Sequence, residues 1–151
     1  MAIDPAVIGR ELPGHEAVVE RGRLRFFAQA IGETNPIYSD VEAAKAAGHR
    51  DVVVPPTFLF CLDMDKPDPF GLLRDLGIDV RYILHGEQRF EYSAPAYAGD
   101  TLSYSGRVTD TYSKKNGALD FLVRTVDVTR EGKPIARLTN TLVVRNPKGT
   151  K

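Results

Sequence analysis

The sequence predicts an α+β protein in which one curved antiparallel sheet wraps a buried helix. Apolar residues recur at helical spacing in the first half of the chain and alternate with polar residues in the second half. The alternating stretches are about twice the usual strand length of ~5–6 residues, and strands of that length twist and bend. The segment after Pro55 and Pro56 is apolar on all sides, so it is the best candidate for the enclosed helix.

Four helices are expected in the first half. The first has apolar residues at positions i, i+3, i+4 and i+7, and the second follows the potential N-cap Asp40 and stops before Gly48. The third is the apolar segment after Pro56. The fourth begins at a first-turn proline after Asp68 and stops at Gly77. The expected ranges are 22–32, 41–47, 57–62 and 69–76.

The period changes to two from Arg81 onward, and three long antiparallel strands are expected. Apolar and polar residues alternate from Leu102 to Thr109, as a strand with one buried face requires. Asn116 and Gly117 form a strong hairpin signal because both tolerate positive φ, and residues 131–133 mark another reversal. The expected strands are about 101–113, 118–130 and 134–145.

Composition narrows the class of protein. A chain of 151 residues fits one domain, 1–151. Twenty Lys and Arg balance 20 Asp and Glu, so no general field attracts nucleic acid or an anionic membrane, and neither partner is expected. The single cysteine, Cys61, lies in an apolar run where burial is expected, and no residue spacing indicates a metal or cofactor site. Without a signal peptide or an apolar run of about 18 residues, a cytoplasmic location is expected.

Three stretches resemble the MaoC-like hot-dog dehydratase family, in the family's order. They are 27–40, which contains Gly32-Glu33-Thr34-Asn35-Pro36-Ile37-Tyr38; then Val54-Pro55-Pro56-Thr57-Phe58; then 95–102. The chain is most similar to the branch called the N-terminal MaoC-like dehydratase domain, which also supplies subunits of heterodimeric 3-hydroxyacyl thioester dehydratases. The resemblance spans about Gly9 to Arg145. It implies a hot-dog fold with a long central helix, and a dimer whose active site lies at the subunit interface.

The resemblance implies reversible addition of water to a trans-2-enoyl thioester of CoA or acyl carrier protein. This reaction needs a base, an acid and donors to the thioester oxygen. Active members carry G-D-x-N-P-x-H. Here Asn35 is retained, but Glu33 replaces the aspartate and Tyr38 replaces the histidine. Glutamate can act as a base from a displaced position, whereas tyrosine, with an unperturbed pKa near ~10, is a poor proton shuttle.

Each of these residues also has a structural interpretation. Glu33 can be a solvated carboxylate at a helix end, and Tyr38 can cover the edge of the core. Asn35 and Pro36 are typical of a turn. These alternatives stay open at the level of sequence.

The family's oxyanion donor lies at the start of the central helix. By position this implies the backbone N–H of Thr57, where active hydratases carry His-Gly and this chain has Pro56-Thr57. Because proline has no N–H, Pro56 fits the first turn and leaves Thr57 to donate. The acyl pocket is expected to be shaped by Pro56, Phe58, Phe60 and Leu62.

His85 is a further candidate. On a strand it would share a face with Glu87, so a His–Glu pair is feasible. A solvated ladder of charged residues explains the same pattern.

The sequence thus predicts a protein of acyl-thioester metabolism that hydrates trans-2-enoyl or dehydrates (R)-3-hydroxyacyl thioesters of CoA or acyl carrier protein. It would act as a homodimer or as a heterodimer with a second MaoC-like subunit that carries the Asp/His pair. Two alternatives remain. One is a hot-dog thioesterase in which Glu33 activates water against the carbonyl; the other is a non-catalytic module that binds acyl thioesters.

Overall fold

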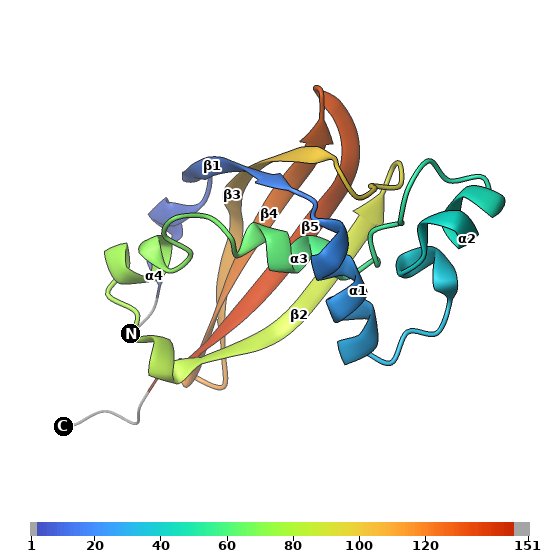
Figure 1. Cartoon of the computed structure of the whole chain (residues 1–151). Helices are drawn as coiled ribbons and strands as arrows, with labels where there is room; N and C mark the ends of the chain where they lie inside the picture. The colour runs from blue at the N-terminus through green and yellow to red at the C-terminus, as the bar shows by residue number, and fades with distance from the viewer. Residues whose placement is uncertain (1–2, 147–151) are drawn as a thin grey trace.

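Five antiparallel strands form one sheet in the order β1-β3-β4-β5-β2, in a computed structural model that describes residues 3–146. The sheet bends around helix α3 (Phe58–Asp63), which lies against its inner face (Figure 1). This is the hot-dog arrangement expected from the sequence. The strands are β1 (Glu11–Val18), β2 (Ile83–Tyr92), β3 (Thr101–Lys114), β4 (Leu119–Arg130) and β5 (Lys133–Arg145).

The three C-terminal strands and both hairpins confirm the prediction. β3 has 14 residues, β4 has 12 and β5 has 13, and adjacent strands pair along nearly their full lengths. Asn116 and Gly117 have φ values of 52° and 80° in the first turn, and Glu131 and Gly132 have 50° and 76° in the second. Residues that tolerate positive φ therefore set both reversals.

Strand β1 was not predicted from the sequence. Pro13 and Gly14 interrupt it, and its register with β3 shifts between Leu12 and His15. The shift breaks the alternation of apolar and polar residues that marks the other strands. β1 occupies one end of the sheet and β2 the other.

Helices α1 (Arg21–Ala30), α2 (Val41–Ala46) and α4 (Gly71–Asp75) lie where helices were expected. Asp40 caps α2 as predicted, since its carboxylate accepts a hydrogen bond of 2.9 Å from the Ala43 N–H. α4 is shorter than expected: it begins at Gly71 after Phe70, and the Asp68 carboxylate pairs with Arg74. Short 3₁₀ turns occupy Pro5–Val7, Pro36–Tyr38 and Val80–Tyr82.

The central helix α3 is buried as expected, but the expected long helix is wrong because α3 has six residues. Two side chains from the sheet bind its carbonyls: the Tyr104 hydroxyl donates to Leu59 over 3.1 Å, and His15 Nε2 lies 2.9 Å from the Leu62 oxygen. Beyond the C-terminal end of α3, Pro67 and Pro69 prevent a helical continuation.

The main core fills the space between α3 and the sheet. Its largest members among those exposed by 2% or less are Leu24, Leu59, Leu62, Leu102, Ile135 and Leu138. A second cluster joins α4 and the N-terminal turn to the far half of β3, β4 and β5. Within residues 3–146, no helix has the length and apolar character that a membrane span requires.

Candidate active site

The loop that carries Glu33 to Tyr38 is fixed beside the segment that leads into α3. The Val53 N–H donates a hydrogen bond of 3.0 Å to the Ile37 carbonyl, and Val53 also forms an isolated bridge with Tyr97. These contacts connect the loop, the segment before Pro55 and the turn before β3. Tyr38 is thereby held, half-buried, on the side of the molecule where α3 begins.

Tyr92 joins this group from the end of β2, and no pattern in the sequence pointed to it. Tyr92 pairs with the buried Ala136, and its hydroxyl donates a hydrogen bond of 2.5 Å to the Pro56 carbonyl. Burial raises the pKa of Tyr92, and the nearby Tyr38 raises it further. Two phenols thus lie next to the first turn of α3.

The backbone N–H of Thr57 is free to bind a ligand. Thr57 is exposed, and no acceptor for its N–H exists among residues 3–146. The neighbouring Phe58 N–H already donates 2.9 Å to the Pro55 carbonyl. The open Thr57 N–H therefore lies beside Tyr92 and Pro56, where the family resemblance implied an oxyanion donor.

Glu33 and Asn35 hold the shape of their own loop. A Glu33 carboxylate oxygen accepts a hydrogen bond of 2.9 Å from the Asn35 N–H, and the Asn35 side chain accepts one of 3.2 Å from the Ile37 N–H. Both side chains are exposed. Within the described residues, neither of these two side chains makes a hydrogen bond or ion pair with Tyr38, Tyr92 or Thr57. The structural interpretation of Asn35 as a turn residue is confirmed.

Of the four residues expected to shape an acyl pocket, Phe60 lines a cavity. Phe58 and Leu62 are 3% and 0% exposed within the core, and the Phe58 ring packs on Phe27 with centroids 5.1 Å apart. Pro56 is exposed at the surface. The structure thus places Phe58 and Leu62 in the core rather than at a cavity wall, and their expected contact with a ligand stays a prediction.

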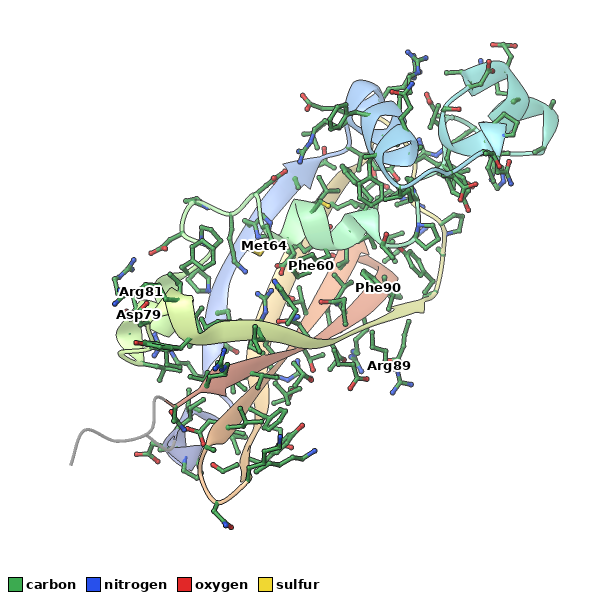
Figure 2. The ribbon with its side chains drawn as sticks, turned by 90° about the horizontal axis from the view of Figure 1, so that it is seen from below. Phe60, Met64, Asp79, Arg81, Arg89 and Phe90 are labelled. Atoms are coloured by element: carbon green, nitrogen blue, oxygen red, sulfur yellow. The ribbon has the colours of Figure 1, made fainter. Side chains whose placement is uncertain are left out.

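The cavity has a volume of about 470 Å³ and lies between α3, β1, β2 and the segment around α4. Phe60 and Met64 reach it from α3, and Figure 2 shows them between this helix and β2. Apolar side chains make up most of the wall. The polar residues that line it include Lys66, His85, Arg124 and Asn140.

The structure does not bring together His85 and Glu87, which the sequence allowed to form a pair. The register of β2 shifts at Gly86, so His85 pairs with Leu142 while Glu87 pairs with the adjacent Thr141. Because adjacent residues of a strand point to opposite faces, the shift places His85 and Glu87 on opposite sides of the sheet. His85 faces inward, where its ring meets Phe60 edge-on with centroids 5.8 Å apart.

A buried charge cluster borders the cavity, and the sequence analysis missed it. It consists of Asp63, Lys66, Arg124 and Asn140. Arg124 Nη2 lies 2.8 Å from the Asp63 carboxylate, Lys66 Nζ lies 3.4 Å from it, and Arg124 Nε donates 3.3 Å to the Asn140 side chain. One signal was available: Arg124 occupies an inward position of β4 between Leu122 and Val126.

Cys61 is half-buried against the core, and burial raises the pKa of its thiol. This agrees with the expected packing role. Among residues 3–146, no group of three or more His, Cys, Asp or Glu residues could hold a metal ion.

Comparison with known proteins places these features in context. The family profile described as "FAS1-like, dehydratase domain region" matches residues 6–138. A UPF0336 protein of Saccharopolyspora erythraea is 42% identical over 147 residues, which cover 96% of this chain and 93% of that protein. A UPF0336 protein of Clavibacter michiganensis is 38% identical over 146 residues, covering 96% and 97%.

Solved structures share the fold. A MaoC-like dehydratase superposes with a TM-score of 0.83 and 25% identity over 93% of this chain, which corresponds to 43% of that protein. The HadBC (3R-hydroxyacyl-ACP dehydratase) complex of Mycobacterium tuberculosis gives 0.74 and 25% identity, covering 91% and 96%. The ChsH1-ChsH2 complex of the same organism gives 0.74 and 23%, covering 93% and 86%.

Proposed function

Because the chain belongs to the FAS1-like dehydratase-region family and has the fold of MaoC-like hot-dog dehydratases, we propose that it takes part in hydration and dehydration of acyl thioesters. The substrates are trans-2-enoyl and (R)-3-hydroxyacyl thioesters of CoA or acyl carrier protein. In the dehydration direction a base removes the proton on the α-carbon, an acid protonates the departing hydroxyl, and negative charge develops on the thioester oxygen. The open N–H of Thr57 is the group of this chain suited to that oxygen.

The chain acts together with a second hot-dog subunit that supplies the Asp/His pair. The observation that carries this proposal is the hydrogen bond between Glu33 and the Asn35 N–H, which engages the loop's one carboxylate in its own backbone. Tyr92 binds the residue before the open donor, and its raised pKa keeps its hydroxyl protonated at neutral pH. A protonated phenol donates a hydrogen bond but removes no proton. Complexes such as HadBC and ChsH1-ChsH2 support a two-subunit arrangement.

In this division of labour, the present chain binds and orients the thioester. Thr57 donates to the carbonyl oxygen, Tyr38 and Tyr92 border it, and Phe60 contacts the acyl chain. β2, an end strand of the sheet, joins the sheet of the partner.

The test is reconstitution. We expect the pure chain to hydrate a trans-2-enoyl-CoA slowly, and an equimolar mixture with a hot-dog protein of the same organism that carries G-D-x-N-P-x-H to be faster. General acid–base catalysis contributes ~10²–10⁴-fold, so a gain of about 100-fold over the sum of the separate proteins is expected. Strong turnover by the pure chain would refute the division.

Free thiol is followed in the same reactions. Hydration leaves the thioester intact, so release of CoA in step with substrate loss would identify the thioesterase alternative. Binding of enoyl-CoA without reaction, alone and with every such partner, would identify a non-catalytic binding module.

A further inference from the structure

The cavity bordered by the buried charge cluster combines a long apolar wall with two cations at one end. Its apolar walls include Leu12, Phe60, Leu72, Leu73, Ile83 and Leu142, and its cations are Lys66 and Arg124. A volume of about 470 Å³ lies within the ~300–1,000 Å³ of typical small-molecule sites. A purely hydrocarbon ligand would need no charged group in the wall, so it does not explain why Lys66 and Arg124 line this cavity.

The buried cluster contains two cationic side chains and one carboxylate. The side chains of Arg124 and Lys66 are 9% and 12% exposed, and they share a single buried carboxylate, that of Asp63, which is 4% exposed. Asp68 also lines the cavity, but its carboxylate is paired with Arg74 at 2.5 Å. One positive charge is therefore left without a counter-ion in a place where desolvation makes unpaired charge costly.

Arg124 keeps one donor for a ligand. Its Nη2 contacts Asp63 and its Nε donates to Asn140, while Nη1 has no hydrogen-bond partner among residues 3–146. The side chain is more than nine-tenths buried and lines the cavity. Lys66 Nζ touches Asp63 only at 3.4 Å, and burial followed by repulsion from Arg124 lowers the pKa of Lys66. Both cations thus lack a strong partner on the cavity side.

We propose that this cavity binds an unbranched apolar chain that ends in a carboxylate. The carboxylate accepts hydrogen bonds from Arg124 Nη1 and Lys66 Nζ, so that two carboxylates, its own and that of Asp63, balance two cations. The chain lies along Phe60 and Leu142, where burial of its methylene groups favours binding.

Two sources supply this chemistry. One is a free fatty carboxylate, whose binding is independent of the proposed function. The other is an acyl thioester whose far end carries a second carboxylate. This source rests on the proposed function, because Phe60 would then connect the cavity to the thioester bound at Thr57. The two sources call for different ligands in the test.

The free-acid arm uses titration calorimetry of the full chain with decanoate and with decanol, which has a similar chain and no charge. Hydrogen bonds to a charged group contribute about 1.5–3 kcal/mol, so decanoate is expected to bind roughly tenfold to a hundredfold more tightly. Lys66→Met should reduce this preference several-fold while decanol binding persists. Lys45→Met, at an exposed lysine of α2, is the matched control and should change nothing.

The thioester arm compares the mono-CoA thioester of decanedioic acid with decanoyl-CoA. Tighter binding of the dicarboxylic thioester, lost in Lys66→Met, assigns the thioester source; discrimination between decanoate and decanol alone assigns the free acid. Because the first arm involves no turnover, a failed reconstitution of hydratase activity leaves it intact.

Equal affinity for the charged and uncharged ligand in both arms would overturn the proposal, as would a preference that survives in Lys66→Met. If Lys66→Met does not fold, Lys66→Gln, which keeps a polar side chain, takes its place with the same expected loss.

Discussion

The hydroxyl of Tyr92 donates a hydrogen bond of 2.5 Å to the carbonyl of Pro56 and so joins the end of β2 to the residue before Thr57. β2 is an end strand, paired on one side only, with β5. The position of the open Thr57 N–H therefore depends on the strand that borders the neighbouring subunit in the proposed complex. In the proposed complex, this contact would couple assembly to the geometry of the candidate oxyanion donor.

Tyr92→Phe removes that hydrogen bond and little else. We expect the free energy of unfolding to fall by about 1 kcal/mol, the usual net value of a hydrogen bond, in urea denaturation. In the reconstituted complex kcat should fall more than KM changes, because the lost contact positions Thr57 rather than the acyl chain. Tyr82→Phe is the control, because Tyr82 is exposed to a similar extent and its hydroxyl makes no hydrogen bond among residues 3–146. An unchanged kcat in Tyr92→Phe would separate this bond from catalysis.

Thr57→Pro tests the donor itself, because proline has no N–H. Removing one oxyanion donor typically costs ~10²–10³-fold in kcat, and a loss of this order is expected in the reconstituted complex. Thr57→Ala retains the N–H and should keep most of the activity, which distinguishes the backbone donor from the side chain. Equal activities of the two variants would rule out Thr57 as the donor.

Local signals were sufficient to predict much of this fold. Alternation in the C-terminal half and the turn residues Asn116 and Gly117 predicted strands and hairpins that the structure contains. The register shift at Gly86 placed His85 and Glu87 on opposite faces, although a shared face was expected. This bulge depends on glycine, because a Cβ at Gly86 would lie 2.7 Å from Val143 Cγ2 on the neighbouring strand. A contact of that kind lies across the sheet and leaves no trace in local periodicity.

The candidate site was predicted less completely for the same reason. Thr57 and Tyr38 were found from a motif, which is local in sequence. Tyr92 meets Pro56, and Asp63 meets Arg124, only through the curvature of the sheet around α3. The one sequence signal for the cluster was the charged Arg124 at an inward position of β4. Nothing in the sequence indicated that Asp63 would be its partner.

The ion pairs of Asp100 should make part of the free energy of unfolding sensitive to acid. Burial alone would raise the pKa of Asp100, but the Tyr97 N–H at 2.9 Å and the guanidinium groups of Arg50 and Arg130 hold it below its usual value. A carboxyl whose pKa is lower folded than unfolded stabilises the fold above its unfolded pKa of about 3.9. That stabilisation is lost as the pH falls through the folded pKa.

Asp100→Asn should therefore cost about 1.5–3 kcal/mol at pH 7, the range for hydrogen bonds to a charged group. The difference between the wild type and Asp100→Asn should shrink as the pH falls below about 4 in urea titrations. Glu42→Gln is the control, because the Glu42 side chain is 86% exposed. A difference that stays constant down to the acid transition would mean that the Asp100 charge adds nothing.

Asp63 and Arg124 should show strong coupling. Removing either partner leaves a buried charge, so Asp63→Leu and Arg124→Met are each expected to cost about 3–5 kcal/mol. The double variant should be less destabilised than the sum of the two, with a coupling energy of about 1–3 kcal/mol in a double-mutant cycle. Additive losses would show that the pair contributes no interaction energy.

Restoring the missing pair is the most direct test of why this chain needs a partner. Glu33→Asp with Tyr38→His recreates G-D-x-N-P-x-H in the existing loop, whose backbone keeps the hydrogen bond from the Val53 N–H to the Ile37 carbonyl when the Glu33 side chain is shortened. An imidazole titrates near neutral pH and can carry the proton that a phenol cannot, so the pure double variant should hydrate enoyl-CoA about 100-fold faster than the wild type. Glu33→Asp with Tyr38→Phe, which removes the phenol without adding an imidazole, should gain nothing. If the restored pair stays inactive while the reconstituted complex is active, the second subunit must supply more than the acid and the base.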